Sequence, residues 1–197
     1  MKTAMLLISV IMGICLVARA EEPQQTKWDA PPAMQIDVNK KYNATIDTSK
    51  GKIIIELFPK EAPKTVNNFV FLAKQHFYDG TEFHRVIPNF MIQGGDRNGK
   101  PAGTGDAGYK FENENKDSAR TFGPGTVAMA NAGPDTNGCQ FFINDGASPW
   151  LKPASYTIFG QVTQGQEVVK AIASVDKDEN DHPHEAVVMK SVTIEEK

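Results

Sequence analysis

The stretch FHRVIPNFMIQGGD (residues 83–96) carries groups that could act on a substrate, although it contains no nucleophile. It has no serine or cysteine, no pair of carboxylates and no spacing of side chains that would hold a metal ion. Arg85 alternates into a mostly apolar strand, and Gln93 follows two residues after Met91. A cation and an amide on an apolar β face are typical of a binding pocket, where they orient and polarise a ligand without reacting with it.

Two more amides and several large apolar residues further along the chain are candidates for the same pocket. Two interpretations remain open on pattern alone. Either the apolar residues belong to a core and the polar ones to the surface, or both sets line one cavity. The residues concerned are Arg85, Gln93, Asn131, Gln140, Phe90, Met91, Phe142, Trp150 and Leu151.

Metal catalysis is not predicted from the four histidines. His182 and His184 are only two residues apart in DHPHE, and His76 and His84 fall in different predicted elements. None of them forms an HExxH motif or a Cys/His cluster, which are the spacings that zinc sites use. We expect His182 and His184 to lie in a solvated loop, and we expect no metal and no cofactor.

Covalent and phosphate chemistry are disfavoured as well. The glycine pairs near residues 94, 103 and 123 lack the spacing and the Lys-Ser/Thr of a phosphate-binding loop. Ser118, Ser148 and Ser155 are in no nucleophile-elbow context. Cys139 precedes Gln140 and an apolar pair, so we expect it to be a buried structural residue.

The first twenty residues differ from the rest of the chain and predict a cleaved signal peptide. Lys2 precedes the apolar run AMLLISVIMGICLVA, and Ala18-Arg19-Ala20 has the small-x-small pattern of a cleavage site. We therefore expect cleavage after Ala20 and export to the periplasm or the exterior. An uncleaved anchor and lipidation at Cys15 are the alternatives, and Asn43-Ala44-Thr45 is a glycosylation sequon if the host is eukaryotic.

Composition restricts the partners of the exported chain. The sequence has 197 residues, of which 40% are hydrophobic and 23% are charged, as is typical of a soluble globular domain. Without Lys2 and Arg19 the 21 basic residues become 19, against 24 acidic ones, so the mature net charge is −5. This charge and the lack of a basic patch argue against nucleic acid as a partner. No later segment is apolar enough to enter a membrane, and Cys139 alone cannot form an internal disulfide.

The periodicity of the chain predicts a mainly β fold. Residues 21–40 are polar and contain prolines, and we expect an extended N-terminal lead-in without a core of its own. A β-hairpin over 41–58 precedes an amphipathic helix in APKTVNNFVFLAKQ, where Val66, Phe69, Val70 and Ala73 repeat at helical spacing. Short strands with many glycines follow from residue 83, and then a second helix at 165–175 and a final strand at 185–196. About eight short strands and two separated helices favour a closed antiparallel barrel.

Long stretches of the chain closely resemble the cyclophilin-type peptidyl-prolyl cis-trans isomerases. The resemblance runs from Lys41 to Glu195 and is carried by APKTVNNFVFLA, FYDGTEFHR, FHRVIPNFMIQGGD, MANAGPDTNGCQFFI and PWL…YTIFGQV. It implies one isomerase domain over 41–197, folded as a closed eight-stranded antiparallel β-barrel capped by two α-helices. It also implies a monomer that acts on proline-containing polypeptides and is a potential target of cyclosporin-type inhibitors.

The resemblance implies specific roles for residues of this chain. Arg85, Gln93 and Phe90 match the catalytic set, in which the glutamine also helps to orient the arginine. The substrate-binding set comprises the proline pocket (Met91, Phe142, Leu151 and Tyr156), the peptide-holding strand (Ala130 and Asn131), the rim (Trp150) and the subsite for preceding residues (Gly103, Ala132, Thr136 and Gln140). Tyr156 replaces a histidine found in many members, and the loop LKPASY departs from the usual pattern.

Two hypotheses of different classes follow from the resemblance. The first is an exported isomerase that assists protein folding, and the second is a module that captures proline segments without turnover. A module without turnover would have no need of Arg85 and Gln93, so their presence favours the isomerase. A hydrolase or metal enzyme has no supporting set of residues.

Overall fold

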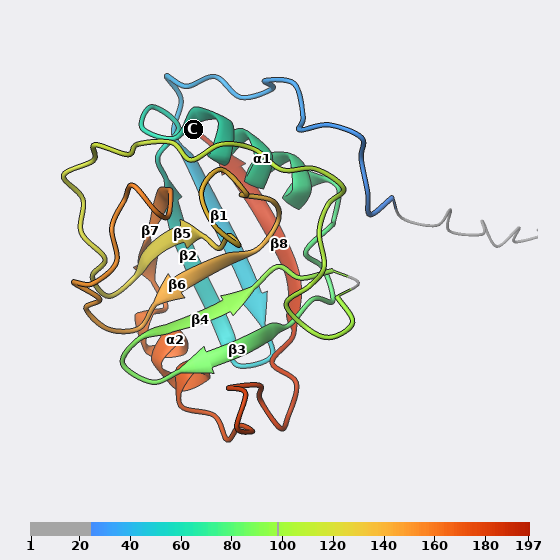
Figure 1. Cartoon of the computed structure of the whole chain (residues 1–197), viewed down its shortest axis with the longest axis vertical. Coiled ribbons are helices and arrows are strands. Elements are labelled where there is room, and N and C mark those ends of the chain that lie inside the picture. The colour runs from blue at the N-terminus through green and yellow to red at the C-terminus, as the bar shows by residue number, and fades with distance from the viewer. Residues whose placement is uncertain (1–24, 98) are drawn as a thin grey trace, which may run out of the picture.

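The computed structural model describes residues 25–97 and 99–197, which form a curled β-sheet with a helix at each end (Figure 1). The predicted signal peptide over residues 1–20, its cleavage after Ala20 and lipidation at Cys15 lie outside the described residues. Among the described residues no helix has both the length and the apolar character needed to cross a bilayer.

The eight strands in the described part of the chain belong to one sheet in which every neighbouring pair is antiparallel. The sheet order is β3-β4-β6-β5-β7-β2-β1-β8. This agrees with the predicted mainly β fold of eight antiparallel strands and two helices. The strands are β1 (Tyr42–Thr48), β2 (Gly51–Leu57), β3 (Phe83–Ile87), β4 (Met91–Gly94), β5 (Thr126–Met129), β6 (Phe141–Asn144), β7 (Ile158–Gln164) and β8 (Met189–Glu196).

The two edge strands, β3 and β8, meet at a short bridge and not along a continuous ladder. Glu82 and Val188 form an isolated antiparallel bridge next to the starts of these strands. The Phe83 amide donates to the Val187 carbonyl at 3.0 Å, beside this bridge. The barrel is therefore closed at one point, and most of the outer edge of β3 is left for other segments to cover.

The helices α1 (Pro63–Lys74) and α2 (Gln166–Ala173) lie at opposite ends of the curled sheet (Figure 1). Pro63 is in the first turn of α1, where a missing amide hydrogen costs nothing. The four residues predicted to form its apolar stripe are all buried, so the predicted helix is confirmed. Phe69 is central to the core, with its ring 5.1 Å from that of Tyr78, 5.5 Å from Phe141 and 5.3 Å from Phe159.

The predicted lead-in packs on α1 and on the loop after β4. The Trp28 ring contacts the Phe71 ring edge-on at 5.2 Å, and the Trp28 amide donates to the Ala107 carbonyl at 2.8 Å. The Asn67 side chain accepts from the Gln35 amide at 2.7 Å and donates to the Ala33 carbonyl at 3.0 Å. The segment from residue 25 to 40 therefore uses the core of the domain, in place of a core of its own.

Two apolar clusters lie on opposite faces of the sheet. Val86, Ile92, Ile143 and Val127 face one another across β3, β4, β6 and β5, and all four are fully buried in the main core. The neighbouring positions on these strands point to the other face, because side chains alternate along a strand. A second, smaller cluster forms there from Met91, Phe122, Ala128, Phe142 and Ile158.

Removal of the Phe69 ring should destabilise the whole domain. Phe69 is fully buried among three aromatic rings, so we expect Phe69→Ala to lower the free energy of unfolding by about 3–5 kcal/mol. Lys74→Ala on the exposed side of the same helix should change it by less than about 0.5 kcal/mol. Urea unfolding followed by circular dichroism measures both, and equal losses would contradict the assigned core.

Burial of His84 should make stability depend on pH. The side chain is only 8% exposed, and burial lowers its pKa below 6.5 because the charged imidazolium is poorly solvated there. The unfolded chain therefore binds the proton first as pH falls, so stability is complete above about pH 6.5 and decreases below it.

A variant without the imidazole isolates this contribution. His84→Gln should lose less stability than the wild type between about pH 7.5 and pH 5, because one preferential protonation of the unfolded state is removed. Thermal unfolding of both proteins across this range is the measurement. Parallel pH profiles would show that His84 does not titrate differently in the two states.

Candidate active site

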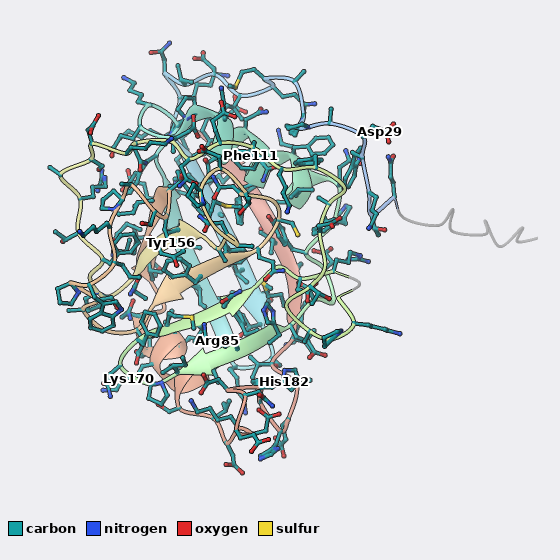
Figure 2. The ribbon with its side chains drawn as sticks, viewed as in Figure 1. Asp29, Arg85, Phe111, Tyr156, Lys170 and His182 are labelled. Atoms are coloured by element: carbon teal, nitrogen blue, oxygen red, sulfur yellow. The ribbon has the colours of Figure 1, made fainter. Side chains whose placement is uncertain are left out.

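One transverse row of side chains crosses the sheet on the face opposite the main core. Arg85 pairs with Gln93, Gln93 with Phe142, and Phe142 with Ala128. Directly paired residues point to the same face of a sheet, so the register places a cation, an amide and an aromatic ring side by side. Figure 2 shows Arg85 beside β3 and β4, with Tyr156 in the direction of β5 and β6.

The row borders a small apolar pocket of about 140 Å³. Phe142 is 5% exposed, and its ring contacts the Tyr156 ring edge-on at 5.7 Å. Trp150 does not line the pocket; it is 61% exposed, and its ring lies 5.6 Å from that of Phe90. The lining residues are Arg85, Phe90, Met91, Gln93, Ala130, Asn131, Phe142, Leu151 and Tyr156, all of them predicted from the sequence.

A second cavity of about 380 Å³ adjoins the first and contains the remaining predicted residues. Gly103, Ala132, Thr136 and Gln140 line this cavity, and Gln93, Ala130 and Asn131 line both cavities. The structure thus brings the predicted residues together into two pockets with a common wall, and Trp150 beside Phe90 near the first.

Gln140 holds this common wall in place. Its amide nitrogen donates to the Gly103 carbonyl at 2.8 Å and to the Gly105 carbonyl at 3.0 Å. Its amide oxygen accepts a hydrogen bond from Gln93 Nε2 at 3.0 Å. The Gln93 side chain is therefore fixed from the side of the second cavity.

Gln93 and Arg85 are paired across β3 and β4, but their side chains have different partners within the protein. Gln93 donates to Gln140, and among the described residues the ionic partner of Arg85 is Asp181, with Arg85 Nε 3.6 Å from Asp181 Oδ2. Asp181 cannot be predicted as a partner of Arg85 from the sequence, because it lies in DHPHE, where the spacing of His182 and His184 indicates a solvated loop. His182 in that loop is only partly exposed, and its Nδ1 donates to the His84 carbonyl at 2.9 Å.

The lead-in supports a segment that lines the second cavity from outside. Lys27 Nζ lies 3.3 Å from Asp106 Oδ1, and the Trp28 amide is bonded to the Ala107 carbonyl. Gly108 has a φ of +94°, and a Cβ atom there would come within 2.4 Å of the Trp28 carbonyl oxygen. This close approach requires glycine, and it holds the segment that carries Asp106 against the lead-in.

Cys139 lines the second cavity but is not a nucleophile at neutral pH. It is buried, and burial raises the pKa of its thiol to about 12. Among the described residues, no three His, Cys, Asp or Glu side chains are grouped so that they could hold a metal ion. What the site offers is a permanent cation, fixed amides and an apolar pocket.

Comparisons with known proteins agree with this site. Residues 43–194 match the family model described as "Cyclophilin type peptidyl-prolyl cis-trans isomerase/CLD". The peptidyl-prolyl cis-trans isomerase ppi1 of Schizosaccharomyces pombe is 46% identical over 154 residues, which are 77% of this chain and 99% of that protein. The probable peptidyl-prolyl cis-trans isomerase A of Mycobacterium bovis is 47% identical over 168 residues, 77% of this chain and 91% of that protein.

A solved structure shows the same fold. The crystal structure of a cyclophilin-type isomerase of Cryptosporidium parvum in the presence of the dipeptide Ala-Pro superposes with a TM-score of 0.72 at 32% identity. The superposition covers 78% of this chain and 98% of that one. Because the family model spans most of the chain and the relatives are matched over nearly their whole length, this chain belongs to the cyclophilin-type peptidyl-prolyl cis-trans isomerases.

Proposed function

We propose that this isomerase acts on proline-containing segments of exported proteins as they fold, and that Arg85 stabilises the rotated amide. The proposed role of Arg85 rests on its position in the wall of the small apolar pocket. The residues that line this pocket include no serine, cysteine or carboxylate. The export part rests on the sequence of residues 1–20 alone.

The reaction is a rotation and requires no bond to be broken. The barrier about an X–Pro bond is about 18–20 kcal/mol, because amide resonance is lost when the bond twists. Without a catalyst the process takes roughly 10–100 s at 25 °C. A site for this reaction must favour the twisted amide over both planar forms, and it needs neither a nucleophile nor a proton relay.

Arg85 suits the twisted amide because its charge and its donors are permanent. Twisting localises a lone pair on the proline nitrogen, and a guanidinium can donate to that lone pair in the twisted state only. Shortening the reaction from tens of seconds to milliseconds takes a factor of about 10⁴, or roughly 5.5 kcal/mol. One preorganised donor typically contributes about 2.7–4 kcal/mol, so Arg85 needs help from the rest of the pocket.

The apolar residues of the pocket would give that help by binding the proline ring. Met91 and Phe142 are 2% and 5% exposed, and with Phe90 and Leu151 they form a wall that excludes water from a ring lying against it. A dry wall favours the twisted amide, which is less polar than the planar one. A fixed ring also gives the preceding carbonyl a stationary axis about which to turn.

The second cavity would hold the residues that precede the proline. Its polar lining, with Gln140 and the backbone near Gly103, suits peptide groups, and its common wall with the first pocket keeps the peptide continuous. The relative crystallised in the presence of Ala-Pro supports a proline-containing peptide as the ligand class. Gln93 and Asn131 lie where the two parts of such a peptide would join.

Replacement of Arg85 should abolish most of the turnover and leave binding largely intact. We expect Arg85→Ala to lower kcat/KM on a proline peptide by about 10²–10³-fold, the loss expected for one preorganised donor. Arg85→Lys keeps the charge but lacks the planar guanidinium, so its kcat/KM should lie between those of the wild type and Arg85→Ala. The measurement is a protease-coupled peptide assay, with peptide binding followed by calorimetry.

A control separates a site effect from general damage. Arg120→Ala removes an arginine that pairs with Glu61 and lies outside both cavities, and it should leave turnover unchanged. Wild-type turnover by Arg85→Ala would refute the mechanism. If the wild-type protein binds proline peptides but does not accelerate their isomerisation, the protein is a binding module.

The export proposal makes a prediction about the N-terminus of the mature protein. Lys2, the apolar run and Ala18-Arg19-Ala20 together suit recognition and cleavage by a signal peptidase. Expression of the full chain in a bacterium with a general secretion pathway should give a periplasmic product whose N-terminal sequencing begins at Glu21. A product that begins at Met1 and stays in the cytoplasm would contradict export, and a membrane-bound product would indicate an anchor.

A further inference from the structure

The side chain of Arg85 needs an external partner to hold its position. It is 45% exposed at the edge strand of the sheet, and an arginine with four rotatable bonds does not stay in one place there without contacts. Gln93 pairs with Arg85 across β3 and β4, but its amide donates to Gln140. Among the described residues, the guanidinium forms an ion pair with Asp181, which lies outside the pocket.

Asp181 belongs to a loop that covers the outer edge of β3. The Val86 amide donates to the Asp181 carbonyl at 2.9 Å, and the Val86 carbonyl accepts from Lys177 Nζ at 2.9 Å. The His84 carbonyl accepts from His182 Nδ1, also at 2.9 Å. The loop thus replaces a neighbouring strand along β3, and Figure 2 shows His182 next to β3 on the side of Arg85 away from Tyr156.

The backbone at Asp181 is shaped for this contact. Its φ is +66°, in the left-handed region that few residues other than glycine, asparagine and aspartate adopt readily. The side chain is 29% exposed, with Oδ1 2.6 Å from Lys177 Nζ and Oδ2 3.6 Å from Arg85 Nε. The Asp181 carboxylate therefore lies between two cations. Arg85 is part of β3, and Lys177 is hydrogen-bonded to the backbone of β3.

Lys177 makes this arrangement compatible with a catalytic cation. A carboxylate alone would cancel much of the field of Arg85 in the pocket, but the lysine compensates its charge, so the group of three remains net positive. Asp181 engages the Nε edge of the guanidinium. In the described part of the chain neither Nη atom has a hydrogen-bond partner, so these donors stay available to a ligand.

We infer that Asp181 is a positioning residue for Arg85, held by Lys177 and by the backbone of β3 so that the guanidinium presents its Nη groups to the proline pocket. This inference rests on the proposed role of Arg85. It extends the site to the loop of residues 176–186, which lines neither cavity.

The sharpest test is Asp181→Asn, because asparagine tolerates the same backbone conformation and can still accept from Lys177. The substitution keeps the size of the side chain and removes the negative charge that faces Arg85 and Lys177. We expect kcat to fall about two- to fivefold at low salt, the range expected for a partly exposed ionic contact, with unchanged KM and unchanged Tm. The difference from the wild type should shrink as added salt screens the pair.

Coupling to Arg85 separates positioning from a structural role. In an Arg85→Ala background, Asp181→Asn should have no further effect on kcat, because the group it positions is absent. Glu179→Gln removes one negative charge from an exposed position in the same loop and should leave kcat unchanged. If Asp181→Asn lowers Tm, Asp181→Gly keeps the left-handed backbone without the side chain, and the Arg85 ¹⁵Nε resonance then reports directly whether the guanidinium has become mobile.

The outcomes distinguish this inference from the proposed function. Wild-type kcat in Asp181→Asn, an equal loss in Glu179→Gln, or an undiminished loss in the Arg85→Ala background would each overturn the positioning role. An unmoved, still ordered Arg85 resonance in Asp181→Gly would do the same. If instead Arg85→Ala itself keeps wild-type turnover, it is the proposed role of Arg85 that fails.

Discussion

The register of β4 between β3 and β6 is the constraint on which the site depends. On the core face, Val86, Ile92 and Ile143 pair in a fully buried row. On the other face, the neighbouring row places Arg85, Gln93 and Phe142 side by side. A slip of one residue would move the apolar row toward solvent and the arginine into the core, at a cost that no pocket contact could offset. The hydrophobic core therefore sets the alignment of the cation, the amide and the aromatic ring along the strands.

The proposed reaction makes different demands on the two cavities of the site. A twisted proline amide is stabilised by one well-placed donor and by the exclusion of water around the ring, whereas the peptide before it must keep its hydrogen bonds. Arg85 and Phe142 belong to the first pocket, Gln140 belongs to the second cavity, and Gln93 joins them through its bond to Gln140. Binding of the preceding residues can thus contribute to holding the ring, because both subsites share the wall that Gln93 and Asn131 form.

Much of this arrangement could be predicted from the sequence, and the parts that could not have a common physical reason. Alternation along FHRVI and FMIQGG, together with the helical spacing of Val66 and Phe69, reflects local burial and was sufficient for the strands and the first helix. The resemblance to cyclophilins supplied the residues that the two cavities bring together. The Asp181 contact and the bond from Gln93 to Gln140 depend on how a polar loop and a pair of amides are placed in three dimensions, and periodicity carries no information about either. For the same reason, the sequence did not predict that β3 and β8 meet only at a single bridge.

The exposed edge of β3 explains why the loop of residues 176–186 is important for the site. An edge strand offers unpaired carbonyl and amide groups, and here the edge carries the one arginine of the apolar pocket. Since β8 reaches only the start of β3, the loop of residues 176–186 supplies partners for His84 and Val86 from its own Lys177, Asp181 and His182. The same contacts that satisfy the edge also carry the carboxylate that faces Arg85. The same loop therefore covers the sheet edge and holds the Arg85 guanidinium. Substitutions that loosen this loop should change the position of Arg85 although they alter no residue that lines either cavity.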